Sequence, residues 1–323
     1  MSRPKVTVMV PVHNPGPYLA PALAAIRNQT LREFEVLLLD DGSTDGSAEV
    51  LAAAARADPR FRLLSPGRVG LVEAANLLGR EARRDYLARY DADDAMHPGR
   101  LEMQVAWLDE RPEVGVVGSL VRHFPAAEVL PGNRRYEQWL NSVVTHEQIS
   151  REFYVESPMP NPSVMMRREV FDLAGGYRDD GLPEDYAFWL RAFEAGVRFE
   201  KIPKVLHYWR DHGRRVTRTH PRYSLEAFLR AKAESLLRGP LSGARPYVVF
   251  GAGMKGRRLT RILARAGHPP LALFDDDPRY LRRTRQGRPV LPLASFRPGS
   301  ALALLATGGA RMRAEWPYDI RVA

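Results

Sequence analysis

Two hydrophobic periods alternate along the first 95 residues. The run KVTVMVPV at 5–12 is apolar almost throughout, which is typical of a strand buried on both faces, and FEVLLLDD at 34–41 repeats this pattern. Between these runs, Leu19, Leu23 and Ile26 recur at helical spacing. Strands that alternate with helices predict crossover units, and therefore an α/β fold whose mostly parallel sheet carries helices on both faces.

The alternation of strands and helices continues further along the chain. Ser43 and Asp45 are suitable starts for an alanine-rich helix, RFRLLS is a short third strand, and DYLARY at 85–90 is a fourth. The stretch VGVVGSLVRHF is another strand within an otherwise mixed region at 112–160. The apolar spacing predicts further helices at 70–84, 98–110, 184–195 and 223–238, and a basic loop at 207–222.

Acidic residues follow two of the predicted strands. Asp40 and Asp41 end the second strand, and Asp91, Asp93 and Asp94 follow the fourth. Ligands of such sheets lie beyond the carboxyl ends of the strands. A divalent cation would relieve the repulsion among these carboxylates, and in an extended segment Asp91 and Asp93 would face one site. The alternative is a turn whose aspartates cap the following helix.

Composition limits the class of protein. The 323 residues include no cysteine, which excludes disulfides and thiol chemistry, and no apolar run is long enough to span a membrane. The N-terminus lacks the apolar region of a signal peptide, so a cytoplasmic protein is expected. Residues 240–323 hold 15 basic and 5 acidic residues, which accounts for the whole net charge of +10. This asymmetry predicts a first domain at 1–238, a linker at 239–246 and a basic domain at 247–323.

The order of motifs resembles that of the family 2 glycosyltransferases, which are inverting enzymes with the GT-A fold. The resemblance covers roughly residues 5–215 and is carried by three blocks: VTVMVPVHNPGPYLAPALAAIRNQTLREFEVLLLDDGSTDGS, GLVEAANLLGREARRDYLARYDADDAMHPGRLEMQ and NPSVMMRREVFDLAGGYRDDGLPEDYAFWLR. It implies transfer of a sugar from a nucleotide diphosphate, most often UDP, to an acceptor hydroxyl. It also implies Mn²⁺ or Mg²⁺ as cofactor.

The same resemblance assigns roles to individual residues. It places one group around the nucleotide, a second around the metal and diphosphate, and a third at the acceptor. The nucleotide group is Pro11, His13 and Asn14 beside the base, Asp41 on a uracil-like base and Asp91 near the ribose. The second group is Asp93, Asp91 and His212 at the metal, with Arg210 binding the nucleotide sugar near the diphosphate. The acceptor group is Asp185 as catalytic base with Glu184 beside it.

Each of these roles has a structural alternative. Asp41 lies in a stretch rich in turn formers, and acids such as Glu184 and Asp185 are common at helix starts. Arg210 and His212 would suit a solvated basic loop equally well. The chain also departs from many relatives, with Ala75-Asn76 where they have Arg-Asn and Asn161 where some have His.

The basic C-terminal domain has a motif of its own. In YVVFGAGMKG, a strand leads through Gly251, Gly253 and Gly256 into a helix, and Asp275 ends the next strand. This order and spacing match the dinucleotide-binding fingerprint, so we expect a small Rossmann-like domain with a second nucleotide site. The alternative is a Rossmann-like module that only supports structure or docks a partner.

Several functions remain open at this stage. The expected partners are a nucleotide-sugar donor and a saccharide or lipid-linked acceptor, with a role in cell-envelope polysaccharide synthesis implied by the resemblance. The run RRTRQGR at 282–288 suits either solvent or an anionic membrane surface, which would place the protein peripherally at the inner face of the membrane. No nucleic-acid partner is expected. The alternatives are a dinucleotide-dependent oxidoreductase, a non-catalytic nucleotide-sugar-binding protein and a nucleotidyltransferase, although the last lacks its glycine- and arginine-rich loop.

Overall fold

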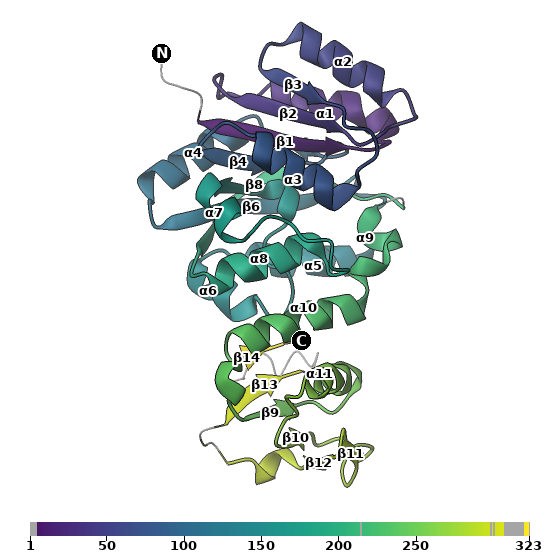
Figure 1. The fold of residues 1–323 in the computed structure, drawn as a ribbon, viewed down its shortest axis with the longest axis vertical. Helices are drawn as coiled ribbons and strands as arrows, with labels where there is room; N and C mark the ends of the chain where they lie inside the picture. Colours follow the sequence, from purple (N-terminus) through teal and green to yellow (C-terminus); the bar gives the residue numbers. More distant parts are fainter. Residues whose placement is uncertain (1–4, 214, 298, 300, 307–319, 323) are drawn as a thin grey trace. The chain divides into compact units, whose positions relative to one another are not determined.

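The chain folds into two compact units. The computed structural model describes residues 5–213, 215–297, 299, 301–306 and 320–322 (Figure 1). The domain boundaries proposed from the sequence, with a linker at 239–246, stay a prediction. The first unit comprises Met1–Ile149, Pro158–Asp179 and Ala195–Thr219, and the second comprises Ser150–Ser157, Asp180–Glu194 and His220–Ala323.

An eight-stranded sheet forms the centre of the first unit. Its strand order is β3-β2-β1-β4-β7-β6-β8-β5. The pairs β3–β2, β2–β1, β1–β4 and β6–β8 are parallel, whereas β7 and β5 pair with their neighbours antiparallel. The mostly parallel sheet predicted from the alternating pattern is therefore confirmed. The strands are β1 Val6–Val12, β2 Glu35–Asp40, β3 Phe61–Leu64, β4 Tyr86–Arg89, β5 Ala95–Met96, β6 Val114–Phe124, β7 Met165–Arg167 and β8 Arg198–Arg210.

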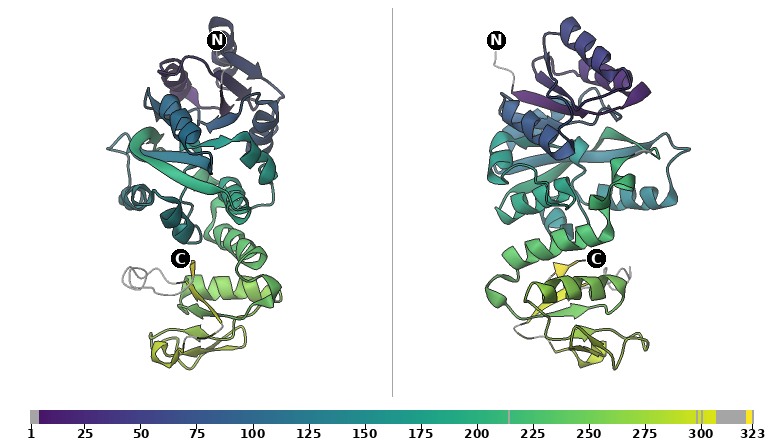
Figure 2. Two further views of the ribbon diagram at one scale, coloured as in Figure 1. Left: turned by 90° about the vertical axis from the view of Figure 1, so that its left-hand side faces the viewer. Right: turned by 45° about the vertical axis from the view of Figure 1, so that its right-hand side comes forward.

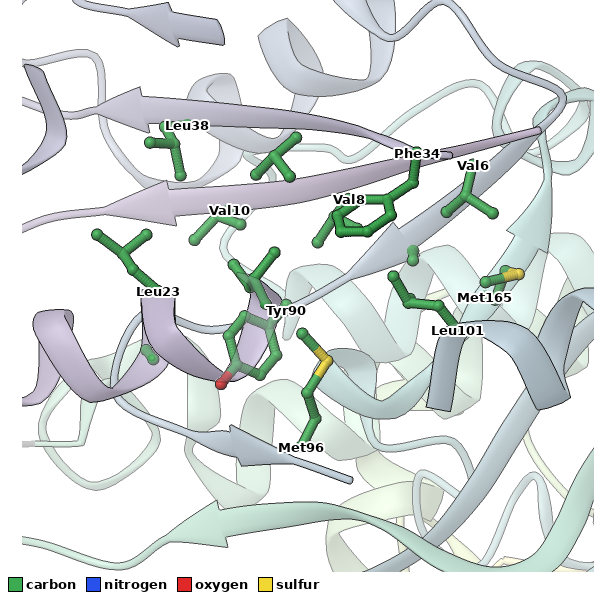
Figure 3. Close-up of a cluster of buried hydrophobic side chains, with 14 of the residues drawn as sticks. Val6, Val8, Val10, Leu23, Phe34, Leu38, Tyr90, Met96, Leu101 and Met165 are labelled. Carbon is green, nitrogen blue, oxygen red and sulfur yellow. The ribbon is translucent and has the colours of Figure 1, made fainter. Parts of the chain in front are cut away.

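Strand β1 is buried because both of its faces are covered. Val6, Val8 and Val10 point to one side, where Leu23 of α1 and Leu101 of α4 pack against them (Figure 3). Helix α3 covers the other face of β1 and β2. Each such side chain contributes about 1.5–3 kcal/mol when it leaves water. The helices that lie within the first unit are α1 Leu19–Arg27, α2 Ser47–Ala57, α3 Leu71–Glu81, α4 Arg100–Glu110, α5 Pro131–Ser142, α7 Arg168–Leu173 and α9 Val216–Thr219.

The strand order brings four loops to one edge of the sheet. Strands β3, β2, β1 and β4 are adjacent and parallel, so their carboxyl ends share an edge. The loops that follow them carry Arg68, Asp41, Asn14 and Asp91, respectively. These loops are where ligands bind in open α/β sheets.

Two segments of the chain differ from the expectation. The start of the predicted basic loop at 207–222 belongs to β8, which runs beside β6 (Figure 2). The pairing of β8 with β6 continues as far as Arg210. The basic composition of this segment favoured a loop in the prediction. In the structure, however, His207 is buried and the Arg210 guanidinium lies over aromatic rings, so basic side chains are compatible with a strand here. The mixed region at 112–160 contains, besides β6, the helices α5 and α6 (His146–Glu152).

The second unit contains a smaller parallel sheet. Its order is β11-β12-β10-β9-β13-β14, in which β11 pairs antiparallel and all other pairs are parallel. Without β11, the chain order of the strands across the sheet is 3-2-1-4-5, which matches the first five strands of the Rossmann order 3-2-1-4-5-6, with the switch point between the first and fourth strands. The predicted Rossmann-like arrangement is therefore present. The elements are β9 Tyr247–Phe250, β10 Leu273–Phe274, β11 Thr284–Arg285, β12 Arg288–Leu291, β13 Leu302–Leu305 and β14 Ile320–Arg321, with helices α8 Glu184–Glu194, α10 Leu225–Arg238 and α11 Met254–Arg265.

The glycines before and within α11 have different reasons to be glycine. A Cβ on Gly256 would lie 1.7 Å from the carbonyl oxygen of Gly251, so the start of α11 can approach β9 only without a side chain there. Gly251 has φ +100°, which other residues rarely adopt. Gly253 has φ −67°, and its Cβ would meet nothing closer than Tyr280 at 3.8 Å.

Gly256→Ala is expected to destabilise the second unit. The added methyl group must push α11 away from the Gly251 carbonyl, which should lower the free energy of unfolding by about 3 kcal/mol. Gly253→Ala is the matched control and should cost less than about 1 kcal/mol, since it changes only a helix N-cap. Urea unfolding of both variants measures the difference. Equal losses would contradict the close approach of α11 to the glycine loop.

Candidate active site

The three aspartates after β4 point in different directions. Residues 92 and 93 form a turn closed by the Asp94 amide, which donates to Asp91 O at 3.3 Å. The extended backbone expected for this segment is therefore not present. Asp94 turns inward and is 1% exposed, whereas the side chains of Asp91 and Asp93 are 37% and 30% exposed. The turn thus relieves part of the repulsion by separating one acid from the other two.

Asp94 anchors the turn to β8. Its Oδ2 lies 2.9 Å from His207 Nε2, and its Oδ1 accepts from the Arg210 amide at 2.8 Å. Arg100 Nη1 lies 3.4 Å from His207 Nδ1. Since a guanidinium can only donate, His207 Nδ1 is the acceptor and Nε2–H donates to Asp94. Burial and the charge of Arg100 lower the pKa of His207, which keeps this imidazole neutral.

Arg100 binds the carboxyl end of β4 through hydrogen bonds from its guanidinium. Its side chain is completely buried and donates to Gln104 Oε1 at 3.1 Å, to Arg89 O at 2.8 Å and to Val164 O at 3.3 Å. Burial lowers the pKa of Arg100 to about 10, so the guanidinium stays charged at neutral pH. The turn that carries Asp91 and Asp93 therefore rests on a buried polar framework.

Arg100→Met is expected to lower the free energy of unfolding by about 3 kcal/mol. The change removes the donation from Arg100 to Arg89 O and His207 Nδ1 in a buried place, and it leaves Val164 O with only the Arg89 amide as donor. Each buried polar group that loses a partner is costly. Lys5→Met is the control, because it breaks an exposed ion pair with Asp109 and should cost under about 1 kcal/mol. A urea unfolding curve for Arg100→Met that coincides with wild type would contradict the supporting role.

Asp93 and His212 meet at the rim of the sheet. Asp93 Oδ2 lies 2.8 Å from His212 Nε2, and Arg210 Nε donates to Asp93 O at 2.7 Å. The Arg210 guanidinium lies between two rings, 4.5 Å from the centroid of Tyr18 and 4.3 Å from that of Phe124. The ring of Tyr18 also lies 5.3 Å from that of His212. The structure therefore brings together three residues that the sequence grouped: Asp93, Arg210 and His212.

Asp93 and His212 fit two adjacent ligands of a divalent cation. Donors bound at about 2.1 Å in neighbouring octahedral positions lie about 3.0 Å apart, close to the 2.8 Å between Asp93 Oδ2 and His212 Nε2. In the described part of the chain, no group of three or more acidic, histidine or cysteine side chains is arranged to hold a metal alone. A cation at this place would need further ligands, such as substrate phosphates and water.

Asp91 lies beside a buried arginine. Arg89 Nη2 donates to Asp91 Oδ1 at 3.2 Å, and Arg89 Nη1 donates to Met9 O at 3.4 Å. The Arg89 side chain is only 3% exposed. The structure thus places a fixed positive charge behind Asp91, which offsets the repulsion from Asp93.

The loop after β1 is joined to the loop after β2. His13 Nδ1 donates to Asp41 O at 2.9 Å, and Asn14 Oδ1 accepts from the Thr44 amide at 2.8 Å. Asn14 adopts φ +49°, a left-handed conformation that asparagine tolerates. Pro11, within β1, is partly exposed. The residues predicted to border a nucleobase therefore lie together at one edge of the sheet.

The Asp41 carboxylate is surrounded by the loop after β3. Its Oδ1 accepts from the amides of Val69 at 2.6 Å and Gly70 at 2.9 Å, and its Oδ2 pairs with the Arg68 guanidinium. No motif in the sequence indicated a role for Arg68. The strand order would have predicted its position, because the loop after β3 must lie beside the loop after β2 in a parallel sheet with this order.

Glu184 and Asp185 belong to the second unit and differ in their surroundings. Glu184 is 6% exposed, accepts a hydrogen bond from Tyr223 Oη at 2.8 Å and pairs with Arg222 Nη1 at 3.5 Å. Asp185 is partly exposed, and its Oδ1 lies 2.7 Å from the Tyr186 amide at the start of α8. The Glu184 carboxylate is therefore buried and held by Tyr223 and Arg222, and Asp185 is the more accessible of the two acids.

The departures from the family pattern have structural roles. Ala75 is buried in α3. Asn76 exchanges two hydrogen bonds with the backbone of Tyr177, at 2.9 and 2.8 Å, and Tyr177 Oη donates to Asn161 Oδ1 at 3.3 Å. These contacts fix the glycine-rich turn at Gly175–Gly176 against α3.

The glycine loop of the second unit is closed by its own acid. Asp275 Oδ2 accepts from the Ala252 amide at 2.7 Å, and its Oδ1 accepts from the Asp277 amide at 2.9 Å. Gly251 and Gly256 are explained by backbone geometry, whereas a Cβ on Gly253 would meet only Tyr280, at 3.8 Å. The second nucleotide site predicted on these residues stays a prediction.

Known proteins share both the sequence motifs and the fold. The family model described as Glycosyl transferase family 2 matches residues 7–173. The provisionally named glycosyltransferase EpsE of Bacillus subtilis (strain 168) is 31% identical over 247 residues, which are 75% of this chain and 86% of EpsE. Among the described residues, no helix is both long and apolar enough to cross a lipid bilayer.

Two solved structures show the fold. TarS 1–349 of S. aureus in complex with UDP-GlcNAc has a TM-score of 0.58 and 20% identity, over 81% of this chain and 72% of TarS 1–349. The mannosyltransferase PcManGT of Pyrobaculum calidifontis, in complex with GDP-Man and Mn²⁺, has a TM-score of 0.53 and 22% identity, over 82% of this chain and 69% of PcManGT. The fold is GT-A, and by its sequence the chain belongs to the family 2 glycosyltransferases.

Proposed function

We propose that this transferase moves a sugar from a UDP-linked donor to an acceptor hydroxyl with inversion and needs Mn²⁺ or Mg²⁺. The observation that carries the proposal is the pairing of Asp93 Oδ2 with His212 Nε2 at 2.8 Å, beside Arg210 and on the same sheet edge as Asp41. Asp93 offers an anionic ligand and His212 an imidazole ligand for the metal of a nucleotide diphosphate. Arg210 offers a fixed positive charge for its phosphates, and Asp41 offers a buried carboxylate for its base.

The first requirement of the reaction is to stabilise the leaving diphosphate. As the bond to the sugar breaks, negative charge grows on the phosphate oxygens. A cation held by Asp93 and His212 would act as a Lewis acid toward this charge. Arg210 contributes a second positive charge, and its place between the rings of Tyr18 and Phe124 limits the reorganisation that it needs.

The second requirement is to remove a proton from the attacking hydroxyl. We propose Asp185 as this general base, because it matches the acid of the family motif and is the more accessible of the two carboxylates at the start of α8. Glu184 has a supporting role, since Tyr223 and Arg222 already occupy its oxygens. A single displacement by the hydroxyl, from the face opposite the diphosphate, inverts the anomeric centre.

The nucleobase subsite lies between the loops after β1, β2 and β3. Asp41 offers an acceptor for a base N–H, and Pro11, His13 and Asn14 form its border. Support for uridine comes from the Asp41 motif and from TarS, which was solved with UDP-GlcNAc. Asp91 would then lie near the ribose, with Arg89 balancing its charge.

The acceptor and the cellular role are proposed at the level of chemical class. We propose a saccharide or lipid-linked acceptor in cell-envelope polysaccharide synthesis, in keeping with the family. The excess of basic residues at 240–323 supports peripheral contact with an anionic membrane surface, where each such residue contributes about 1 kcal/mol. No observation favours the oxidoreductase, nucleotidyltransferase or non-catalytic alternatives over a transferase.

Nucleotide release tests the proposed function. The purified protein is incubated with UDP- and GDP-linked sugars and with saccharide acceptors, with Mn²⁺ or with a chelator. Release of UDP that requires the metal, and a product of inverted anomeric configuration, are the expected results. Equal release in the presence of the chelator would contradict the role of the cation, and release of GDP alone would contradict the assignment of uridine.

A further inference from the structure

The two carboxylate oxygens of Asp41 have partners of different kinds. Oδ1 accepts from the backbone amides of Val69 at 2.6 Å and Gly70 at 2.9 Å. Oδ2 pairs with the guanidinium of Arg68, a side chain. The Asp41 side chain is 4% exposed and that of Arg68 is 56% exposed, so an exposed arm reaches from solvent onto a buried carboxylate.

Only one of these partners can leave without moving the main chain. The amides of Val69 and Gly70 belong to the main chain of the loop that leads into α3, whose N-cap Gly70 has φ +87°. The Arg68 guanidinium can withdraw by rotation about its own side-chain bonds, and solvent around its exposed side chain screens its attraction to Asp41. The acceptor position at Oδ2 is therefore the exchangeable one.

A nucleobase needs the same acceptor position. With Oδ1 already accepting from two amides, Oδ2 is the oxygen left to receive a base N–H, which suits a base with a single imide N–H. A Cβ on Gly42 would lie 3.1 Å from Arg68 Cβ and Arg68 N, so the loops after β2 and β3 pack closely and leave Arg68 directly beside Asp41. The guanidinium and the base compete for one place.

We propose that Arg68 is a gate on the nucleobase subsite, which must swing away from Asp41 before the donor binds. This inference rests on the proposed function, because that function gives Asp41 its ligand. The closed pair lowers the apparent affinity for nucleotide by the fraction of molecules that are open. Removing the guanidinium should therefore tighten binding, which is the opposite of what removal of a ligand contact would do.

Affinity measurements on Arg68→Ala test the gate. Calorimetric titration with UDP and Mn²⁺ is expected to give an affinity about two- to fivefold tighter than wild type, as the loss of a weak, partly exposed ion pair implies. Arg56→Ala is the matched control, since it removes the same charge from the exposed side of α2 and should leave affinity unchanged. Weaker or unchanged binding by Arg68→Ala would overturn the proposal.

Uridine gives a second, independent readout. Because uridine carries no charge, added salt acts on the protein's own ion pairs rather than on attraction of the ligand. Wild type is expected to bind uridine more tightly as ionic strength rises, and Arg68→Ala is expected to lose this dependence. The same salt dependence in both proteins would overturn the gate.

Asp41→Asn separates failure of the gate from failure of the proposed function. The amide cannot accept at both of its terminal atoms, so UDP affinity should fall by about tenfold. If Asp41→Asn weakens binding while Arg68→Ala does not tighten it, the subsite stands and the gate is wrong. If Asp41→Asn binds UDP as well as wild type, the base does not bind at Asp41 and both proposals fall.

Discussion

Asp93→Asn is expected to lower kcat/KM by about 10³-fold. The carboxylate is the only anionic ligand in the Asp93–His212 pair, and its loss should remove the cation that stabilises the leaving diphosphate. Such stabilisation is worth several kcal/mol, and each 1.36 kcal/mol corresponds to about tenfold in rate. The variant should also need a much higher Mn²⁺ concentration to reach its residual activity. Initial rates of UDP release over a range of Mn²⁺ concentrations measure both effects.

Asp85→Asn is the matched control for this variant. Asp85 is exposed and precedes β4, whereas Asp93 follows the same strand, so the two changes are chemically identical and lie at opposite ends of one element. The control should keep wild-type kcat/KM and wild-type dependence on Mn²⁺. An Asp93→Asn variant that folds and retains more than about a tenth of wild-type activity would contradict the assignment of Asp93 as a metal ligand.

Asp185→Asn is expected to lower kcat by about 10²- to 10⁴-fold while the affinity for UDP stays within about twofold of wild type. An amide cannot take the proton from the attacking hydroxyl, and Asp185 has no role in holding the nucleotide in the proposed mechanism. Initial-rate assays of sugar transfer measure kcat, and a titration with UDP measures the affinity.

The control for the base is Asp180→Asn. Asp180 is exposed, lies in the segment that leads to α8, and accepts from the Leu182 amide at 3.1 Å through an oxygen that asparagine retains. Its kcat should match that of wild type. If Asp185→Asn loses UDP affinity in proportion to kcat, then Asp185 acts on the donor or on folding and the general-base proposal is wrong.

The sequence predicted the sheet and the grouping of acids well because both depend on local patterns. Buried parallel strands have continuous apolar runs, and β1, β2 and β4 were found within two residues of their observed ends. Asp93, Arg210 and His212 were assigned to one group through the family resemblance, and the structure brings them into contact. Their roles in metal and phosphate binding stay predictions.

The sequence did not reveal the partners that depend on register and long-range packing. His207 lies in a basic stretch, and its contact with Asp94 follows from the pairing of β5 with β8, which no local pattern specifies. The pairing of Arg68 with Asp41 likewise requires the order of β3 and β2. The prediction that residues 91–93 are extended was wrong, because this segment contains a turn. The turn places the Asp94 carboxylate in contact with His207 and the Arg210 amide.

A crystal structure with UDP and Mn²⁺ tests the central claim most directly. The expected result is an anomalous manganese peak within about 2.3 Å of both Asp93 Oδ2 and His212 Nε2, with diphosphate oxygens completing the coordination. Asp93 and His212 would then both bind the ion and would no longer form a hydrogen bond with each other. UDP bound while the 2.8 Å contact between Asp93 and His212 persists, with manganese elsewhere or absent, would contradict the account.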